Sequence, residues 1–565
     1  MIKRYSMVMT ADIQQDSKVT TQVGSRLYKT NPNLEIRLVC VEDSVANTGF
    51  RKISAYIKTI HQNTKIAYIP TFCKGSWVNK ILRRTKADFG DNNIRNVAQW
   101  MAKGDIAAFC SMTQSSPDVY KIIDEVRRLN PNSYIIWGGI HAIVEPEDAI
   151  KHADAVCTGE GEFAFKIFLE LFKKGKDYTT APGFWFNKDN KIIKNRNLPL
   201  MTEKEMDELP TLTYQDGEFI YHRDKGFKLL NATNIIDYQE LSYSTVWSIG
   251  CPLHCSYCAN TKFIEHDSAY RRLRHSSVRT IINELKRAIS KQPHLSAIAF
   301  HDDSFMALPY KTLEEFCKLY KAEIKIPFAV YGIIPNYVKE DKIVLLLDAG
   351  MNLVRMGIQS GSERILEFYR RPTTLKRIKE GVAIINKYRK YMIAPQYDII
   401  VDNPLETPDD IKATVDLIYE MPRPFALNVY SLRVIPNTQL AKDLEGKGFD
   451  IPSITKYYFI GYNKTMANCL IFILTFWKMP RWLYKILRKK IYSIQMKQPR
   501  YPILFMFARL GTFIKRYLNH MRFLDFTHNL GKTGYYLTKF RIVKIWRHLF
   551  WKRYHLVKQN LKVKT

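Results

Sequence analysis

The feature that most constrains this 565-residue chain is the stretch GCPLHCSYC at residues 250–258. Its three cysteines, Cys251, Cys255 and Cys258, are close enough for one loop to direct three thiolates to a single point. Thiolates are the usual ligands of iron–sulfur clusters, most of which use four of them. Three ligands therefore predict a [4Fe–4S] cluster with one iron open to a small molecule. The alternatives are three buried structural cysteines or half of a zinc site, although no second cysteine or histidine pair follows.

The pattern CxxxCxxC, with an aromatic residue before the last cysteine, resembles the signature of the radical S-adenosylmethionine (SAM) enzymes. The resemblance implies that the open iron chelates the amino and carboxylate groups of SAM. It also implies that one electron from the cluster cleaves SAM to a 5′-deoxyadenosyl radical, which abstracts hydrogen from a substrate. The spacing of the cysteines by itself implies none of these steps.

Chain length and cysteine content indicate the number of domains and the cellular compartment. A chain of 565 residues is too long for one ordinary core, so two or three domains are expected. Nine cysteines without a secretory leader favour a reducing compartment. No apolar run reaches the roughly 18 residues that a membrane-spanning helix needs. The sequence therefore predicts a cytoplasmic protein.

Residues 1–165 alternate apolar strands with amphipathic helices, the pattern of a doubly wound parallel sheet. Strands are expected at 36–41, 106–111 and 134–137. A helix is expected to follow, with Ser116 as its N-cap and Pro117 as its first residue. Small residues come directly after the strands, at the edge where parallel sheets bind ligands.

The same region resembles the cobalamin-binding domain that precedes many radical SAM cores. The resemblance is carried by Ser-x-Thr, Trp-Gly-Gly-x-His-Ala, Pro-Glu-Asp-Ala and Gly-Glu-Gly-Glu, at residues 111–113, 137–142, 146–149 and 159–162. It implies a cobalamin site lined by small residues: Ser111, Thr113, Gly138, Gly139 and Gly159. The better-known Asp-x-His-x-x-Gly motif, whose histidine replaces the nucleotide base on cobalt, is absent. The lower face of cobalt is therefore expected to have a different environment.

Residues 166–235 are expected to be a connector containing a hairpin, with strands at 183–186 and 191–193. Residues 236–450 then show about six strand–helix repeats, which fit the partial (β/α)₆ barrel of a radical SAM core. The stretch 245–249 is expected to be the strand that leads into the cysteine loop. The predicted fold class is thus α/β, with a mainly helical, basic region at 451–565.

One segment of the central region matches the family's Glu/Gln-Ser-Gly-Ser motif, which contacts the ribose and carboxylate of SAM. It comprises Gln359, Ser360, Gly361 and Ser362, just after a predicted strand. A flexible glycine and hydroxyl groups suit an approach to a polar ligand. An ordinary Ser-Gly turn that caps a helix is the alternative.

Charged residues complete the expected SAM site. Asp302 and Asp303 end a strand where the family places acceptors for the SAM amino group, although carboxylates there can equally cap a helix. Arg371 falls where relatives carry an arginine near the SAM carboxylate, with Arg370 as the alternative. Residues 402–407 resemble a Gly-x-Pro-Gly-Glu-Thr turn but lack both glycines, so a structural role is expected. No catalytic acid or base is predicted.

The net charge of +32 is concentrated in residues 451–565, which contain 24 Lys and Arg and a single acidic residue, Asp525. Apolar stripes at 480–491 and 542–550 alternate with bases, as in helices that lie in an anionic membrane interface. A small helical domain with a solvated basic surface is one alternative. Stacking on single-stranded RNA is another, but no recognised RNA motif supports it, so nucleic acid is not an expected partner.

Together these features predict a cobalamin-dependent radical SAM methyltransferase, with a [4Fe–4S] cluster, SAM and cobalamin as cofactors. The resemblance implies methyl transfer to an unactivated carbon and an electron donor such as flavodoxin or ferredoxin. The basic aromatic region favours a lipid or other small-molecule substrate and a peripheral contact at the inner membrane face.

Three alternatives remain. One is a cyclase or coupling enzyme of the same class. Another is a tRNA methylthiotransferase, for whose second cluster Cys40, Cys73 and Cys110 lack the sequence context. The last is a non-catalytic corrinoid-binding or membrane-docking protein. The other cysteines, including Cys157, Cys317 and Cys469, are expected to be small core residues.

Overall fold

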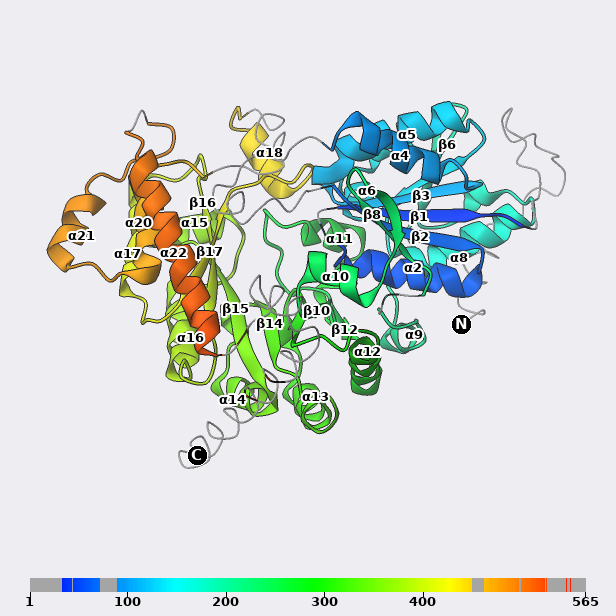
Figure 1. Ribbon diagram of the computed structural model, residues 1–565. Helices are drawn as coiled ribbons and strands as arrows, with labels where there is room; N and C mark the ends of the chain where they lie inside the picture. Colours follow the sequence, from blue (N-terminus) through cyan, green and yellow to red (C-terminus); the bar gives the residue numbers. More distant parts are fainter. Residues whose placement is uncertain are drawn as a thin grey trace.

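The computed structural model describes residues 33–42, 44–71, 89–212, 214, 216–449, 462–496, 499–523, 525, 545 and 549. Two large sheets lie side by side, and a group of helices covers the end of the second sheet away from the first (Figure 1).

The first sheet has a parallel centre flanked by helices on both faces. Its central strands are β1 Ile36–Glu42, β2 Thr64–Pro70, β3 Ile106–Ser111, β4 Tyr134–Gly138 and β5 Ala155–Cys157, in the spatial order β5-β4-β3-β1-β2. Successive residues of β1 point to opposite faces, as pleating requires. Leu38 packs with helices α2 (Thr48–Ile60) and α8 (Gly161–Lys173), whereas Val39 packs with α4 (Asp91–Met101) and α5 (Ser116–Leu129). The predicted doubly wound sheet is confirmed.

The start of α5 differs from the prediction by one residue. A 3₁₀ turn, η1 (Thr113–Ser115), runs directly into α5, so Ser115 occupies the N-cap position, and its side chain makes no capping hydrogen bond. Pro117 lies within the first two helical positions. Ser116 was the wrong N-cap because the sequence gives no sign of the 3₁₀ turn before it.

Residues 166–235, expected to be a connector, add four strands to the edges of this sheet. The predicted hairpin is present as β6 (Phe184–Lys188) and β7 (Lys191–Lys194), and β6 pairs antiparallel with β5. At the other edge β8 (Phe219–His222) pairs parallel with β2, and β9 (Gly226–Leu229) pairs with β8. The segment also contains η2 (Tyr178–Thr180), α9 (Glu203–Asp207) and α10 (Ala232–Gln239).

The second sheet is the expected partial barrel. Its six strands are parallel and adjacent in the order of the chain: β10 Ser242–Thr245, β13 Ala297–Phe300, β14 Phe328–Ile333, β15 Met351–Gln359, β16 Gln396–Val401 and β17 Ala426–Ser431. The helices around it are α12 Val278–Lys291, α13 Tyr310–Glu323, α14 Glu340–Ala349, α15 Glu363–Phe368, α16 Leu375–Lys387 and α17 Pro408–Glu420. Its short 3₁₀ turns are η3 Ser268–Arg271, η4 Phe305–Ala307 and η5 Pro335–Tyr337.

The prediction of one continuous strand at residues 245–249 is wrong. The barrel strand β10 ends at Thr245, and β11 (Ser248–Ile249) pairs antiparallel with β12 (Arg274–His275) outside the barrel. The backbone N–H groups of Trp247 and Ser248 donate to the Asp302 carboxylate at 3.2 and 2.6 Å. This buried carboxylate takes donors that a continued strand would have paired with its neighbour, so the chain leaves the barrel here.

Helix α18 (Gln439–Glu445) follows the last barrel strand. The described part of residues 451–565 is mainly helical, as predicted, with α20 Met466–Phe476, α21 Arg481–Arg488 and α22 Pro502–Arg522. Helix α20 is buried along almost its whole length and joins the barrel core, packing against α17 and α22. The stripe expected at 480–491 corresponds to α21, but the one at 542–550 lies outside the described residues apart from Ile545 and Leu549. Within the described part of the chain, every helix is too short or too polar to cross a bilayer.

Arg51 of α2 ties the two sheets together from a fully buried position. Its Nε donates to the carbonyl of Leu212 and its Nη1 to the carbonyl of Ser244 in β10, both at 2.8 Å. The guanidinium also lies over the rings of Tyr214 and Tyr243, at 4.7 and 4.8 Å. A buried cation held by two carbonyls and two rings fixes α2 against the first barrel strand.

Arg51→Met should destabilise the fold, because it removes two charge-assisted hydrogen bonds that are worth about 1.5–3 kcal/mol each. We expect a loss of about 3 kcal/mol or more, measured as a lower melting temperature or urea midpoint. The matched control is Arg128→Met, whose guanidinium is exposed on α5. An Arg51 variant as stable as the control would contradict the assigned role.

Candidate active site

The cysteine loop lies between β11 and α11 (Asn260–His266), and its three thiols share one apolar cluster. Cys251 and Cys255 are buried and Cys258 is half-buried. The loop begins at Gly250, whose φ is +119° and whose missing Cβ would lie 2.6 Å from the carbonyl oxygen of Arg272. Only glycine fits at this close approach.

The spread of the thiols distinguishes between the candidate metals. Zinc at about 2.3 Å from each sulfur would hold neighbouring sulfurs about 3.8 Å apart. Cys251, Cys255 and Cys258 do not form a group whose sulfurs all lie within 4.8 Å of one another. Burial raises the pKa of Cys251 to about 11 and raises that of Cys258 further, so a metal must displace protons. The loop fits a multi-iron cluster better than a single zinc ion.

Arg371 lies against this loop, and Arg370 is exposed. The Arg371 Nη1 approaches the Cys255 sulfur at 3.8 Å and the Tyr257 hydroxyl at 3.3 Å, while Nη2 donates to the carbonyl of Gly357 at 2.6 Å. Its Nε is buried and has no hydrogen-bond partner in the structure. A buried donor without a partner fits a site for an acidic ligand group. Of the two arginines, Arg371 is therefore the one at the site.

The two carboxylates at the end of β13 have different positions. Asp302 is buried, and besides the two backbone donors it accepts a hydrogen bond from the Ser248 hydroxyl at 2.6 Å. Burial raises its pKa to about 6. The Asp303 side chain is exposed, although loss of hydration in its surroundings raises its pKa to about 6 as well. Asp302 thus shapes the loop, and Asp303 is the carboxylate open to a ligand.

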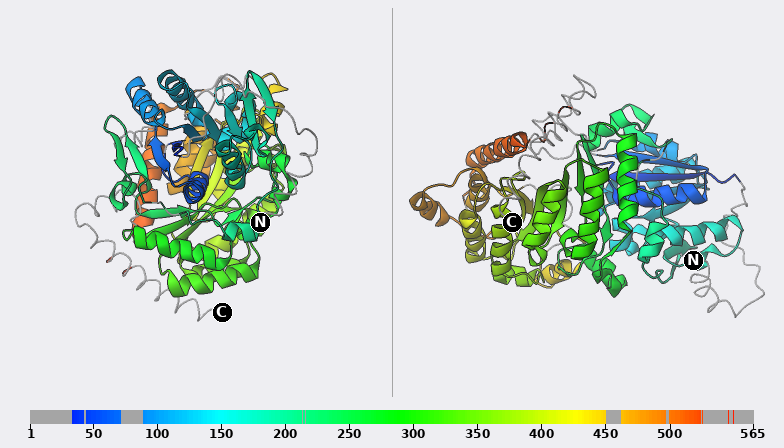
Figure 2. Two further views of the ribbon diagram at one scale, coloured as in Figure 1. Left: turned by 90° about the vertical axis from the view of Figure 1, so that its right-hand side faces the viewer. Right: turned by 90° about the horizontal axis from the view of Figure 1, so that it is seen from below.

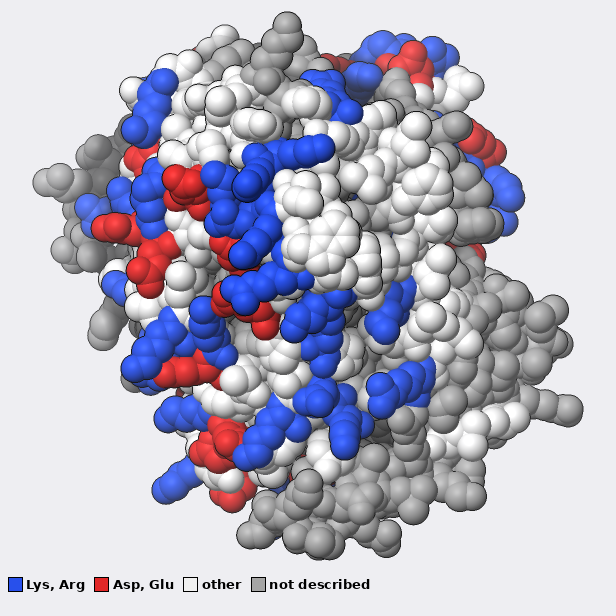
Figure 3. All heavy atoms as spheres, turned by 90° about the vertical axis from the view of Figure 1, so that its left-hand side faces the viewer, with Lys and Arg blue, Asp and Glu red and all other residues white. Residues whose placement is uncertain are grey.

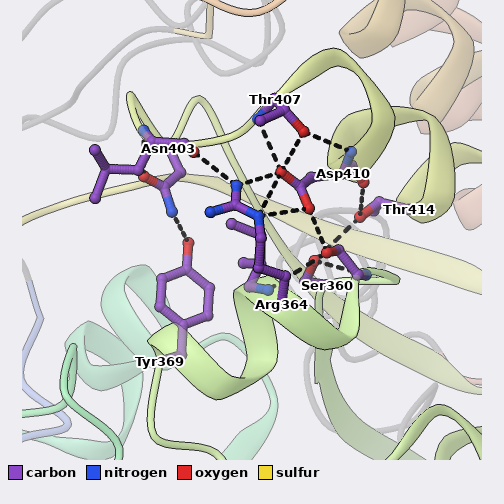
Figure 4. A network of polar contacts seen from close by, with 10 residues as sticks. Ser360, Arg364, Tyr369, Asn403, Thr407, Asp410 and Thr414 are labelled. Carbon is purple, nitrogen blue, oxygen red and sulfur yellow. Dashed lines mark hydrogen bonds and ion pairs between the residues drawn. The ribbon is translucent and has the colours of Figure 1, made fainter.

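The turn at residues 359–362 is held in place by hydrogen bonds to side chains of α17. The Ser360 hydroxyl lies 3.2 Å from that of Thr414, which also accepts from the N–H of Gly361 at 2.9 Å (Figure 4). The Ser362 hydroxyl donates to Asp410 at 2.5 Å and caps α15. A Cβ on Gly361 would lie 2.6 Å from the carbonyl oxygen of Ala413.

Both serine hydroxyls are therefore engaged within the protein. Hydrogen bonds from Arg364, Ser362 and Thr407 hold the pKa of Asp410 below its usual range despite burial, which keeps this carboxylate charged (Figure 4). Gln359, at φ +72°, is the member of the turn whose side chain is not held by α17. The Ser-Gly-Ser sequence thus forms a packed turn, and the contacts of residues 359–362 with SAM stay a prediction.

The residues expected to line a cobalamin site come together at the carboxyl ends of β3, β4 and β5: Ser111, Thr113, Gly138, Gly139 and Gly159. Ser111 accepts a hydrogen bond from Trp137 Nε1 at 3.1 Å. Gly139 has φ +88°, and a Cβ there would lie 3.0 Å from the Ser111 backbone. The hydroxyls of Thr113 and Ser115 are buried without a partner in the structure. Such groups fit a polar ligand at this edge, and Ser115 was missed because it lies outside the Ser-x-Thr motif.

His141, in the Trp-Gly-Gly-x-His-Ala motif, is not available to such a ligand. It is fully buried, with Nδ1 3.5 Å from Glu145 and Nε2 3.5 Å from Asp148. Its ring packs on Trp137 at 4.8 Å. The histidine therefore fastens α6 (Ile140–Val144) to α7 (Pro146–Ala149).

The two candidate sites face each other, because loops after the strands of one sheet contact those of the other. Arg433, after β17, pairs with Gln114, after β3, at 2.5 Å. Arg274, in β12 beside the cysteine loop, pairs with Glu160, after β5, at 2.7 Å. These contacts join residues more than 100 positions apart, and nothing in the sequence pattern indicates the pairs.

Comparisons with known proteins agree with this arrangement. Residues 245–418 match the radical SAM superfamily, and residues 50–169 match the B12 binding domain. A protein of Pyrococcus horikoshii, named as the uncharacterized methyltransferase PH0819, is 23% identical over 354 residues, or 62% of this chain and 71% of that protein.

Two solved structures share the fold. The radical SAM methyltransferase TsrM from Kitasatospora setae, with cobalamin and a [4Fe-4S] cluster bound, aligns at 15% identity and a TM-score of 0.56 over 73% of this chain and 75% of that one. The cobalamin-dependent SAM radical enzyme OxsB with aqua-cobalamin bound aligns at 15% identity and a TM-score of 0.56 over 94% and 81%.

The barrel, with its three-cysteine loop, defines a radical SAM protein. The sheet that faces this loop is a B12-binding domain, so the chain combines an N-terminal B12-binding domain with a radical SAM domain.

A small cavity of about 20 Å³ lies behind the barrel loop at 402–407, between α17 and α20. Glu406 lines it and is 6% exposed. Burial, together with the nearby charges of Asp410 and Asp402, raises the pKa of Glu406 to about 8. The folded protein therefore holds a proton here that an unfolded chain releases near pH 4.5.

Glu406→Gln should change the pH dependence of stability. As pH rises from about 5 to about 8, the wild-type native state loses stability at up to ~1.4 kcal/mol per pH unit, because only the unfolded chain releases the proton. The glutamine variant lacks this loss, so its melting temperature relative to wild type should increase with pH. Melting curves at pH 5, 7 and 9 measure the effect. Glu363→Gln, at an exposed position, should show a constant difference, and a constant difference for Glu406→Gln would disprove the raised pKa.

Proposed function

We propose that the chain is a cobalamin-dependent radical SAM methyltransferase that methylates an unactivated carbon of a small-molecule substrate. The observation that carries the proposal is the juxtaposition of two ligand-binding edges. The cysteine loop at the mouth of the barrel faces the edge of the B12-binding sheet that holds the buried hydroxyls of Thr113 and Ser115. The relatives named as methyltransferases support transfer of a methyl group, and one further relative is named as a cyclase.

Cys251, Cys255 and Cys258 would hold a [4Fe–4S] cluster, and Asp303, Gln359 and Arg371 would surround SAM. Thr113, Ser115 and the glycines at 138, 139 and 159 would contact cobalamin. When bound, the cluster supplies an electron to SAM, and cobalamin supplies a carrier for the methyl group.

The contacts of Arg371 indicate that it positions the cysteine loop and can bind an acidic group of the ligand. Its guanidinium connects the cysteine loop to β15 through Gly357, so it fixes the distance between the cluster and the strand that ends in Gln359. Its positive charge stabilises the neighbouring thiolates. Its free Nε can donate to a carboxylate.

Asp303 offers the opposite charge on the other side of the loop. Its exposed carboxylate can accept hydrogen bonds from an ammonium group. A raised pKa near 6 leaves it ionised at neutral pH, so it is ready to bind a cation. Arg371 and Asp303 together suit a ligand that carries both charges, as the amino acid end of SAM does.

The proposal includes an electron donor, since the cluster must be reduced, and a flavodoxin or ferredoxin fits that need. It also places the protein in the cytoplasm or on the inner membrane face. The substrate is proposed to be a lipid or another small molecule.

Metal analysis is the first test. Anaerobic reconstitution with iron, sulfide and hydroxocobalamin, followed by desalting, should leave about four irons and one cobalt per chain. After a chemical reductant has brought the bound corrinoid from cobalt(III) to cobalt(I), label from SAM carrying a labelled methyl group should appear on it. Four irons without cobalt would refute the cobalamin mechanism and keep a radical SAM enzyme, whereas seven or eight irons would indicate the second cluster of a methylthiotransferase.

Cys255→Ala tests the cluster ligands. The variant should lose the iron and the visible absorption of the reconstituted protein, because two thiolates do not hold the cluster. Cys317→Ala, which removes a buried cysteine of α13 outside the loop, is the matched control and should keep about four irons. Circular dichroism checks that both variants are folded. Full iron content in Cys255→Ala would exclude this residue as a ligand.

A further inference from the structure

Helix α22 is oriented with its apolar face outward. Its exposed side chains recur at helical spacing along one face, and each is between 39% and 69% exposed: Ile503, Met506, Phe507, Leu510, Phe513, Ile514, Leu518 and Met521. At 1.5 Å per residue this stripe is roughly 30 Å long. A helix on a water-facing surface shows the reverse pattern, with its apolar face inward.

Contacts on the inner face of α22 fix the rotation of the helix about its own axis. Arg516 donates to the side-chain oxygens of Gln396 and Asn428 of the barrel, both at 2.9 Å. The Arg509 guanidinium lies over the rings of Tyr462 and Phe472, at 5.2 and 4.7 Å. Gly511 lets α20 approach closely, since a Cβ there would lie 2.6 Å from the Phe476 ring. These contacts, together with Leu504, Phe505 and Ala508 packing against the barrel core, hold the helix in place, so its apolar stripe faces outward.

Neighbouring α21 adds to the same region. Trp482 and Ile486 are 65% and 51% exposed, although Tyr484 between them is buried. Bases surround these apolar residues and are exposed: Lys478, Arg481, Lys485, Lys489, Lys490 and Arg500. Between residues 462 and 523 the sequence has no acidic residue. Figure 3 shows an uncharged area on this side of the molecule, bordered by many lysine and arginine side chains with fewer acidic ones among them.

The described residues leave the stripe on α22 uncovered. The two described positions beyond residue 525, Ile545 and Leu549, are themselves 55% and 38% exposed.

We propose that α21 and α22 form a docking surface for an anionic lipid bilayer. The apolar stripe would enter the boundary between headgroups and acyl chains, while the surrounding Lys and Arg contact the headgroup phosphates. An anionic partner is favoured over a neutral one, because residues 462–523 contribute many bases and no acids to this surface. The surface lies at the end of the molecule away from the B12-binding sheet (Figure 2). The inference does not depend on the proposed methyl transfer.

Vesicle flotation with the full chain tests the proposal. The protein should float with phosphatidylglycerol vesicles and at least tenfold less with phosphatidylcholine vesicles. Leu518→Glu should reduce flotation at least tenfold, because it places a charge in the stripe. Leu518→Gln should have a smaller effect, since it removes apolar area without adding negative charge.

The matched control is Leu229→Glu on β9, which makes the same change at a residue 58% exposed, compared with 54% for Leu518. It should float as wild type does, and melting curves check the folding of each variant. Absence of flotation with both vesicles, or equal loss in both Glu variants, would refute the proposal. It would also be refuted if wild type dimerised through the stripe, shown by light scattering, or bound single-stranded RNA, without binding vesicles. Iron and cobalt content serves as a separate readout, so failure here is distinct from failure of the proposed chemistry.

Discussion

The position of the cysteine loop depends on one buried carboxylate, that of Asp302. Asp302 accepts hydrogen bonds from the backbone of Trp247 and Ser248, and so ends the first barrel strand and directs the next residues outward. In the antiparallel pair that results, Gly250 directly follows β11 and Arg274 lies in β12. From there the cysteine loop turns toward the barrel mouth, and Arg274 reaches Glu160 of the other sheet. A single acceptor thus sets the position of the loop and one of the contacts between the two sheets.

The sequence predicted the parts of this fold that depend on local patterns. The alternation of strands and helices predicted both sheets, and the CxxxCxxC spacing predicted a loop that gathers three thiols. The family resemblance pointed to Arg371 and to the small residues after β3, β4 and β5, and the structure brings these to the expected edges. Such features need only neighbours in the chain to be recognised.

Other features of the fold and the site could not be predicted from local patterns, because they depend on contacts between residues that are distant in the sequence. The ends of β10 and β11 depend on Asp302, more than 50 positions away. The serines at 360 and 362 resembled ligand contacts, yet Thr414 and Asp410 hold both hydroxyls. The outward face of α22 depends on where Arg516 finds its acceptors, and helical periodicity cannot tell which face meets the protein. In each case a partner far along the chain decided the role of a locally recognisable residue.

The hydrogen bonds around Asp410 limit how the sequence can change during evolution. Arg364, Ser362 and Thr407 all converge on this one carboxylate, which belongs to a helix on the outside of the barrel. A change of Asp410 leaves three donors without an acceptor and loosens the turn that ends in Gln359. Substitutions at these four positions should therefore be accepted together or rejected together, so that related sequences vary there as a set. The start of α17 is therefore under the same selection as the turn that it supports.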